Sequence, residues 1–311
     1  MKEIAIDVHG LTKSFGTRTV VHDLSLQVPK GEIYGFLGPN GSGKTTTLRM
    51  LCGLLTPDAG EGTCLSYDIR TQSDAIKRNV GYMTQRFSLY ADLSIRENLE
   101  FVARVYGVPN PRQAAREAIG RLGLSTRADQ LAGELSGGWK QRLALGCAIL
   151  HDPPVLFLDE PTSGVDPLAR GAFWHLIHDL AETGHTIFVS THYMDEAEYC
   201  HRLALMYRGK VIALGSPSEM KAGMASHGLL NLETSDPLAS MRALEGVTGV
   251  RDVAVFGGGL HLAVDDAAAT AARVRERLGA QGIAVRKIEE IEPSMEDVFV
   301  ALIEAEERKV A

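Results

Sequence analysis

Residues 38–46 read GPNGSGKTT and directly follow the apolar run IYGFL at 33–37. The spacing of the glycines, Lys44 and Thr45 satisfies the phosphate-loop pattern G-x-x-x-x-G-K-[ST], which requires a buried strand before it and a helix after it. The segment 46–51, TTLRML, is typical of that helix. In such a loop, backbone N–H groups and the helix N-terminus surround phosphates. The stretch therefore predicts a nucleoside triphosphate site, in preference to a glycine-rich turn that binds nothing.

The residues of this loop have separate predicted tasks. The Lys44 ammonium reaches the β and γ phosphates, and the Thr45 hydroxyl is offered to magnesium. Glycines permit an approach to the phosphates that any Cβ would block. The other residues of the predicted cradle are Gly38, Pro39, Asn40, Gly41, Ser42, Gly43 and Thr46.

Length and composition indicate a soluble globular protein with material for two domains. The chain has 311 residues, of which 45% are hydrophobic and 23% charged. No apolar run approaches the roughly 20 residues that cross a bilayer. Asp7 and His9 interrupt any apolar core of a signal peptide, so we expect a cytosolic protein without direct membrane insertion.

Charge and cysteine usage exclude two further classes. A net charge of -7 argues against sequence-independent binding to nucleic acid, which needs a basic face. The cysteines stand far apart, with no C-x-x-C pair, so neither a zinc site nor a disulfide framework is predicted. They are expected to be reduced core residues: Cys52, Cys64, Cys147 and Cys200.

The N-terminal segments are predicted to form antiparallel edge strands. Alternating apolar residues at 4–8 and 20–28 are typical of such strands. Between them, 11–16 is predicted to be a turn that carries Phe15. Two interpretations of Phe15 remain open, an exposed aromatic or a core residue at a strand end.

Polar residues follow three predicted buried strands. Gln85 follows the strand 79–84, the acidic pair Asp159 and Glu160 follows the apolar run VLFL, and His192 follows the strand 186–190. The carboxyl ends of strands are where open α/β sheets place their ligands. Two adjacent carboxylates at the tip of a buried strand are costly unless a cation or a reaction needs them. We therefore expect a functional cluster, although a Gln or a His in such a position is often only structural.

Helical patterns occupy the middle of the chain, in an insertion at about 88–150. Ser94 and Glu97 form a capping box before the first of its helices. The insertion ends in LSGGWKQR at 135–142, followed by an Ala-rich helix. Its first turn, which provides a second anion-binding helix end, consists of Ser136, Gly137 and Gly138.

Further along, Asp166 and Pro167 predict an N-cap and first turn for a helix that ends near Gly184. A hairpin at 202–214 and a short helix capped at Ser216 follow.

After a predicted linker at 221–228, the order of elements becomes β-α-β-β-α-β, which is typical of ferredoxin-like domains. This unit, 229–311, contains no acid pair, His cluster or glycine-rich cradle. We expect it to serve folding, dimerisation or regulation, with a terminal helix near 294–299 packed back on the body. The first domain is predicted to span 1–220.

In order, GPNGSGKTT, Gln85, LSGGWKQR, VLFLDEP, SGVDP and His192 resemble the ATP-binding subunits of ABC transporters, over about residues 1–220. The Ser-Gly-Gly signature separates this family from other phosphate-loop proteins. The C-terminal unit, which ends in EPSMEDVF at 292–299, is similar to that of the drug and antibiotic (ABC-2 type) exporter branch. The resemblance implies an α/β P-loop ABC ATPase domain with a helical insertion and an antiparallel β edge, plus a small α+β ferredoxin-like domain.

The resemblance also implies how the site works. Two copies, or one copy and a paralogous ATPase, form a head-to-tail dimer with ATP between the phosphate loop of one and the signature of the other. Phe15 would stack on adenine, and magnesium (Mg2+) would be served by Thr45, Gln85 and Asp159. Glu160 resembles the general base, and His192 the sensor of the γ-phosphate. The segment 163–166, with Asp166, resembles the loop through which the two sites communicate.

By the same resemblance, ATP hydrolysis powers export through a separate integral-membrane permease. The cargo class implied is drugs, antibiotics or lipid-like compounds. The ATPase would be cytoplasmic and peripheral on the inner face of the cell membrane. The sequence departs from the family at Trp139, where Gln is usual, which leaves a ribose contact in doubt, and Phe15 stands where Tyr is common.

Two alternative functions are weighed against this one. The first is a soluble ABC ATPase that acts on nucleic acid or the ribosome, but such proteins commonly fuse two ATPase halves or insert long coiled coils. The second is a regulator that binds ATP without cleaving it. Intact Glu160 and His192 oppose the second alternative, while Trp139 favours it.

Overall fold

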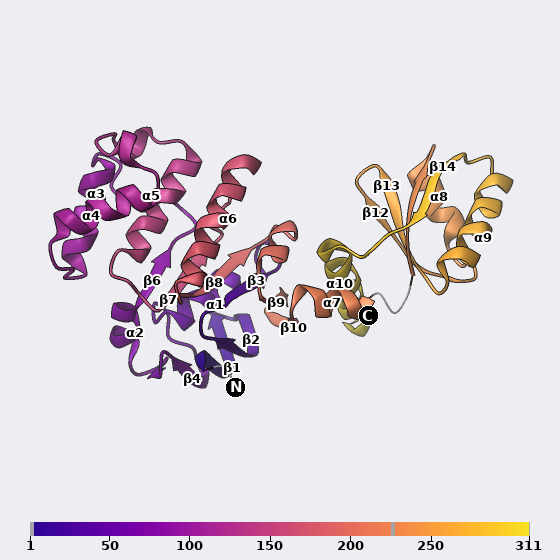
Figure 1. Cartoon of the computed structure of the whole chain (residues 1–311). Helices are drawn as coiled ribbons and strands as arrows, with labels where there is room; N and C mark the ends of the chain where they lie inside the picture. The colour runs from indigo at the N-terminus through magenta and orange to yellow at the C-terminus, as the bar shows by residue number, and fades with distance from the viewer. Residues whose placement is uncertain (1–2, 225–227, 311) are drawn as a thin grey trace. The chain divides into compact units, whose positions relative to one another are not determined.

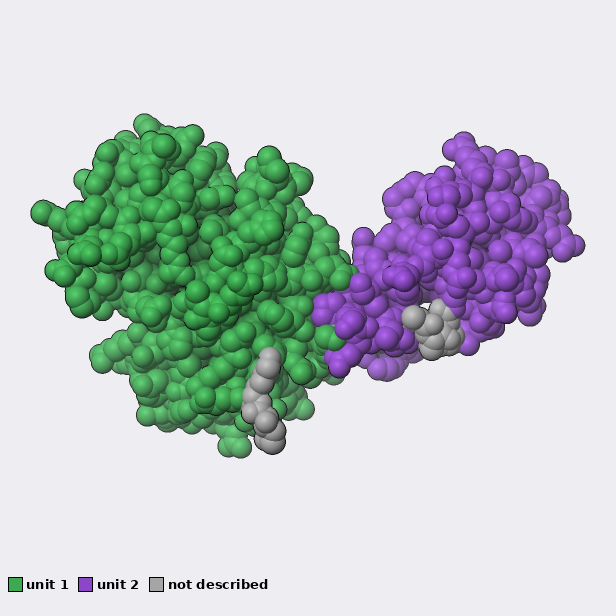
Figure 2. Space-filling view, in the orientation of Figure 1, with its two compact units in different colours: residues 1–216 green, residues 217–311 purple. Residues whose placement is uncertain are grey.

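The structure is a computed structural model that describes residues 3–224 and 228–310. The chain divides into two compact units, Met1–Ser216 and Pro217–Ala311 (Figure 2). The limits at residues 220 and 229 taken from the sequence remain predictions.

A six-stranded sheet forms the centre of the first unit. The pairs β9–β3, β3–β8, β8–β7 and β7–β6 are parallel, and β10 is an antiparallel edge. Three of its strands are buried along their whole length, as their continuous apolar runs predict. In spatial order the strands are β10 (Lys210–Gly215), β9 (Arg202–Tyr207), β3 (Ile33–Leu37), β8 (Thr186–Thr191), β7 (Val155–Asp159) and β6 (Val80–Met83).

A second, antiparallel sheet has the strand order β2-β1-β4-β5. The predicted turn at 11–16 is wrong, because β1 continues to Phe15, which pairs with Arg18. Gly10, with φ 66°, lies at a shift in register, so an irregularity in the ladder absorbs it and the strand goes on beyond. The strands are β1 (Ile4–Phe15), β2 (Arg18–Pro29), β4 (Ala59–Cys64) and β5 (Tyr67–Asp68).

Helices α3, α4 and α5 group together at one side of the first unit, in the upper left of Figure 1. The capping box of Ser94 and Glu97 is confirmed at the start of α3. The helices of this unit are α1 (Lys44–Leu51), α2 (Ser73–Asn79), α3 (Ile95–Val105), α4 (Pro111–Arg121), η1 (Ser125–Arg127), η2 (Ala132–Glu134), α5 (Gly137–Ile149), α6 (Pro167–Glu182) and η3 (Asp195–Tyr199).

The core of this unit joins the two sheets and α1. Phe188 lies at its centre: its ring centroid is 5.5 Å from that of Tyr34, 5.3 Å from that of Phe36 and 5.8 Å from that of Phe157. Cys52 and Cys64 belong to the same core, and all four cysteines are buried free thiols. This core therefore fixes one face of the central strands against α1 and the second sheet.

The second unit contains a four-stranded sheet of order β12-β13-β11-β14 in which every neighbouring pair is antiparallel. With its two helices this is the predicted ferredoxin-like arrangement. Its elements are β11 (Gly228–Thr234), α8 (Pro237–Leu244), β12 (Val250–Phe256), β13 (Gly259–Val264), α9 (Ala267–Ala280) and β14 (Val285–Glu290).

Two more helices belong to this unit, α7 (Pro217–Met224) and α10 (Met295–Val310), which contact each other. The predicted linker at 221–228 is wrong at its start, because Lys221 to Met224 continue the helix that Pro217 begins. Residues 225–227 of that prediction lie outside the described residues.

No helix within 3–224 and 228–310 combines the length and the apolar content that crossing a bilayer requires.

The capping box gives a first prediction. The Ser94 Oγ accepts from the Glu97 N–H at 3.2 Å, and the Glu97 carboxylate accepts from the Ser94 N–H at 2.8 Å. We expect Ser94→Ala to lower the free energy of unfolding by about 1 kcal/mol, because one donor at the end of α3 loses its acceptor. Urea unfolding measures this. Ser125→Ala, at an exposed serine of η1, is the matched control, and equal effects of the two changes would contradict the cap.

Candidate functional site

The phosphate loop joins β3 to α1 and is packed against backbone on two sides. A Cβ on Gly38 would lie 2.2 Å from the Met206 carbonyl oxygen, and one on Gly43, whose φ is 109°, would lie 2.8 Å from the Val20 carbonyl oxygen. Both positions therefore require glycine. The Ser42 Oγ is a buried atom without a hydrogen-bond partner among the described residues, a vacancy that a phosphate oxygen fits.

Hydrogen bonds connect this loop to the antiparallel sheet. The Gly209 N–H donates to the Ser42 carbonyl oxygen at 2.9 Å, and the Gly209 carbonyl oxygen accepts from the His22 N–H at 2.8 Å. Gly209 lies in the turn between β9 and β10, and His22 lies on β2. The loop thus has a continuous backbone link to β2.

Lys44 is buried, with a side chain only 4% exposed. Its Nζ donates to the carbonyl oxygens of Gly38 and Pro39, at 2.8 and 3.2 Å, and lies 3.4 Å from the Glu160 Oε1. Burial lowers the pKa of Lys44, and the Glu160 carboxylate opposes that shift. A buried ammonium held within the phosphate loop is chemically suited to bind phosphate.

Asp159 ends β7 and gathers oxygen groups around it. Its Oδ1 accepts from the hydroxyls of Thr45, at 3.1 Å, and Ser190, at 2.8 Å, while the Tyr82 hydroxyl donates to its Oδ2 at 3.4 Å. Burial raises the pKa of Asp159, and the hydrogen bonds from Ser190 and Thr45 oppose the rise. Carboxylate and hydroxyl oxygens are ligands suited to Mg2+, which keeps most of its other ligands as water or phosphate.

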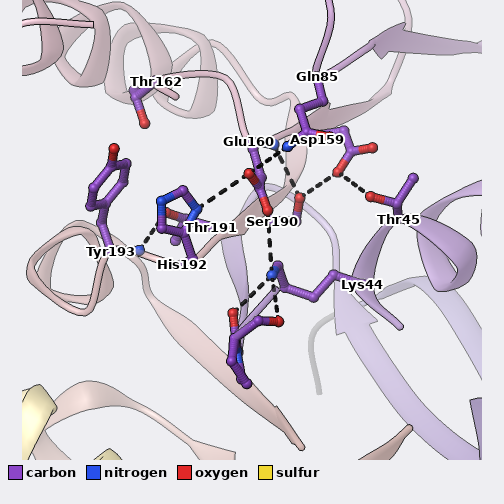
Figure 3. A network of polar contacts seen from close by, with 12 residues as sticks. Lys44, Thr45, Gln85, Asp159, Glu160, Thr162, Ser190, Thr191, His192 and Tyr193 are labelled. Atoms are coloured by element: carbon purple, nitrogen blue, oxygen red, sulfur yellow. Dashed lines mark hydrogen bonds and ion pairs between the residues drawn. The ribbon is translucent and has the colours of Figure 1, made fainter. Parts of the chain in front are cut away.

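Glu160 is the centre of the site (Figure 3). The Gln85 amide donates to its Oε2 at 2.7 Å, and the His192 Nδ1 lies 3.2 Å from the same atom. With Lys44 on its other oxygen, this 6% exposed carboxylate faces three groups that carry or can carry a proton. Its φ of 47° is strained for a non-glycine residue, and hydrogen bonds from its N–H to the carbonyl and hydroxyl oxygens of Ser190 hold it there.

The structure thus brings part of the predicted set together and leaves the rest apart. One network of polar contacts contains Lys44, Thr45, Gln85, Asp159, Glu160 and His192.

Phe15 lies elsewhere, 52% exposed at the end of β1, which settles the open question of its exposure. Asp166 caps α6 by accepting from the Ala169 N–H at 3.0 Å.

The signature residues stand at the N-terminus of α5, outside this network. Ser136 is the N-cap residue, and a Cβ on Gly137 would lie 3.4 Å from the Gly164 carbonyl oxygen. Next to them, two guanidinium groups contact the Trp139 ring. The Cζ atoms of Arg127 and Arg142 lie 5.0 and 5.2 Å from its ring centroid. Trp139, the residue that departs from the family pattern, therefore makes cation–π contacts within the same chain.

Sequence analysis missed Glu196, a fully buried carboxylate on η3. It accepts from the Thr162 hydroxyl at 2.5 Å and from the Thr191 hydroxyl at 2.6 Å. Thr162 is two residues after Glu160, and Thr191 directly precedes His192, so Glu196 ties together the backbone on both sides of the site. No spacing distinguishes it from its acidic neighbours Asp195 and Glu198, and only burial does.

Taken together, the geometry provides a phosphate cradle, a pair of oxygen ligands for a cation and a carboxylate positioned beside the lysine. This combination fits transfer of a phosphoryl group to water, in which the protein mainly positions the reactants and stabilises charge.

Comparisons with known proteins agree with that chemistry. The family description "ABC transporter" matches residues 21–163, and "ATP-binding protein DrrA1-3-like, C-terminal domain" matches residues 215–303. The chain is 39% identical over 280 residues to the Nod factor export ATP-binding protein I of Paraburkholderia xenovorans, covering 89% of this chain and 91% of that one. It is 47% identical over 239 residues to the probable multidrug ABC transporter ATP-binding protein YbhF of Escherichia coli. That match covers 76% of this chain, which spans only 40% of the length of YbhF.

A solved structure has the same fold as the first unit. It is described as the dimeric structure of a post-hydrolysis state of the ATP-binding cassette MJ0796 bound to ADP and Pi. Its TM-score is 0.63 and its identity 26%, over 68% of this chain and 98% of that chain. The predicted cassette fold and the predicted family are confirmed.

The buried carboxylate of η3 gives the prediction of this section. We expect Glu196→Ala to lower the free energy of unfolding by about 3 kcal/mol or more, because two buried hydroxyls lose their shared acceptor. Thermal or urea unfolding measures the change. The matched control is Asp195→Asn, whose side chain is 69% exposed in an ion pair with Arg170, and which should cost less than about 1 kcal/mol. If both variants were equally stable, the tie between the two segments would be refuted.

Proposed function

The chain belongs to the ATP-binding proteins of ABC transporters, and from this premise we propose that it hydrolyses ATP between two copies to power export through a separate membrane permease. The observation that carries the proposal is the position of Glu160. Glu160 directly follows Asp159, the proposed metal ligand, in the sequence. Its Oε1 lies 3.4 Å from the Nζ of Lys44, the proposed phosphate ligand. Because Lys44 would bind the γ-phosphate, Glu160 would lie close to that phosphate, where a general base for the attacking water is needed.

The residues of the network have distinct roles in this proposal. Lys44 exchanges its two carbonyl partners for the β and γ phosphates, which are stronger acceptors because they are charged. Glu160, released from Lys44, orients water and takes its proton. The Gln85 amide, which donates to Glu160, and His192, whose Nδ1 lies 3.2 Å from the same oxygen, hold the orientation of Glu160. His192 senses the γ-phosphate.

Magnesium fits beside these groups. Bound through Thr45 and Asp159, with Gln85 at its edge, it would neutralise charge on the phosphates. Asp159 is prepared for this role by the Ser190 hydroxyl, which fixes the same oxygen that the Thr45 hydroxyl contacts.

Two copies are needed because a single chain keeps its signature turn apart from its phosphate loop. The α5 N-terminus, opened by Ser136, offers unpaired backbone N–H groups to an anion. In a head-to-tail dimer this turn would complete the triphosphate site of the partner copy. Phe15, exposed at the end of β1, would provide the aromatic surface for adenine. The dimer of the similar cassette supports this arrangement.

The cargo and partner are proposed from the relatives. YbhF is described as a probable multidrug transporter protein and the Paraburkholderia protein as serving Nod factor export. By analogy the chain would dock on an integral-membrane permease at the cytoplasmic face and drive export of drugs, antibiotics or lipid-like compounds. It would bind no nucleic acid.

ATP binding without hydrolysis is the competing function, and Trp139 is the observation that favours it. The two flanking guanidinium groups make Trp139 a fixed part of the helical insertion. Ser136 and Gly138, whose backbone would face phosphate, do not depend on that side chain. We therefore expect hydrolysis to survive.

The general base is tested by Glu160→Gln. We expect unchanged ATP binding, a fall in turnover of at least about 100-fold, and an ATP-bound dimer on size exclusion, because the amide keeps the shape but cannot take a proton. Phosphate release measures turnover. Glu117→Gln, at an exposed glutamate of α4, should hydrolyse ATP normally. If Glu160→Gln hydrolysed ATP at the wild-type rate, Glu160 would not be the general base. If the unmodified chain hydrolysed no ATP, the binding-only function would be favoured.

The cradle is tested by Lys44→Ala. Loss of the charged donor should weaken ATP binding by about 10- to 100-fold. A fluorescent-nucleotide titration measures this, with Lys77→Ala on α2 as a control, because that lysine is paired at the surface with Asp74. An unchanged dissociation constant for Lys44→Ala would contradict phosphate binding by the loop.

A further inference from the structure

Arg170 joins the first turn of α6 to the segment that follows His192. Its guanidinium Cζ lies 3.9 Å from the centroid of the Tyr193 ring. Its Nη1 donates to the Asp195 Oδ2 at 3.2 Å, and its Nε lies 3.7 Å from the Glu196 Oε1. The Arg170 side chain is only 18% exposed, so these contacts hold the guanidinium group partly away from water.

Tyr193 connects this guanidinium group to the catalytic network. Its ring packs against the His192 imidazole, with centroids 4.1 Å apart and ring planes inclined at 36° (Figure 3). The Tyr193 N–H donates to the Thr191 hydroxyl at 3.0 Å, which fixes the backbone on either side of His192. The His192 Nδ1 lies 3.2 Å from the Glu160 carboxylate. Contacts therefore run without a break from Arg170 to Glu160.

The first turn of α6 is a firm anchor for Arg170. The Arg170 N–H donates to the Asp166 carbonyl oxygen at 2.9 Å, and the Asp166 carboxylate accepts from the Ala169 N–H at 3.0 Å. The signature turn of α5 packs at the same place, since a Cβ on Gly138 would lie 3.2 Å from the Cβ of Ala169. Arg170 therefore connects the turn that supports the signature with the Tyr193 ring.

A purely structural role for Arg170, as the counter-charge of the buried Glu196, is the alternative. The 3.7 Å between their atoms is longer than a hydrogen bond, and the Arg170 Nε is buried without a hydrogen-bond partner in the described part of the chain. The pair with Asp195 contributes little, because that side chain is 69% exposed. The geometry therefore favours Tyr193 as the residue that Arg170 positions.

We propose that Arg170 is a positioning residue for ATP hydrolysis. It holds the Tyr193 ring in place, and that ring holds the His192 imidazole beside Glu160. A guanidinium group over an aromatic face is attracted by the ring quadrupole, and partial burial strengthens that attraction. Without the contact the imidazole would be free to turn away from Glu160, so fewer bound ATP molecules would meet a correctly arranged site. The inference rests on the proposed hydrolysis and adds Arg170 and Tyr193 to it.

Two variants of the full chain, Arg170→Gln and Tyr193→Leu, test the proposal. Each should lower kcat for ATP by about tenfold, because a partly buried cation–π contact is lost. KM should change by less than about twofold, because neither side chain is proposed to bind the nucleotide. Phosphate release at varied ATP concentration measures both constants. Arg121→Gln, at an exposed arginine of α4, is the control and should turn over as the unmodified chain does.

Tyr193→Leu separates positioning from charge balance, because it leaves the pair of Arg170 and Glu196 in place. Full turnover in either variant, or a raised KM with unchanged kcat, would overturn the proposal. Tyr193→Phe keeps the ring and should recover most of the turnover that Tyr193→Leu loses. A phenylalanine variant as slow as the leucine variant would also overturn it.

A second measurement does not depend on turnover. In a chain labelled with 13C at histidine, the His192 Cε1–H signal is assigned by its absence from His192→Ala. It should move in Arg170→Gln and in Tyr193→Leu, because the neighbouring ring shifts or is lost, and stay in place in Arg121→Gln. An unmoved signal in both variants would refute the inference alone. No turnover in the unmodified chain would instead overturn the proposed function, and with it the role of Arg170 in hydrolysis.

Discussion

The parallel pairing of β7 with β8 is the constraint on which the functional site depends. It places Asp159 opposite Ser190, so that the Ser190 hydroxyl binds Asp159 while its backbone carbonyl holds the strained Glu160. Both strands are fully buried, and a shift of one residue would move every side chain to the opposite face. The apolar core therefore sets the positions of the carboxylates, and the polar network has little freedom of its own.

Sequence reasoning succeeded where a residue's role is carried by local spacing. The glycine loop, the capping box at Ser94 and the β-α-β-β-α-β order were all accessible, because each depends on neighbours in the chain. The turn predicted at 11–16 was wrong because the β1–β2 ladder takes up a shift in register between Val8 and Leu11, and pairing then continues to Phe15. Glu196 was invisible because its two partners, Thr162 and Thr191, lie 34 and 5 residues away. The segment 195–198 contains three acidic residues and is typical of a solvent-exposed turn, so its sequence does not indicate that Glu196 is the buried one.

The first unit surrounds its buried acidic groups with donors. Asp159 accepts from the hydroxyls of Thr45 and Ser190, and Glu160 accepts from the Gln85 amide and lies 3.4 Å from the Lys44 ammonium. Buried carboxylates held in this way are typical of a functional site, because burial alone would disfavour their charge.

The backbone link from β2 through Gly209 to Ser42 has a mechanical consequence. Because the Gly43 position also abuts the Val20 carbonyl of β2, the antiparallel sheet and the phosphate loop form one stiff body. A displacement of that sheet would carry the loop with it instead of being absorbed between them. Phe15 of β1, which we propose as the contact for adenine, and the cradle proposed for the phosphates therefore keep a constant spacing.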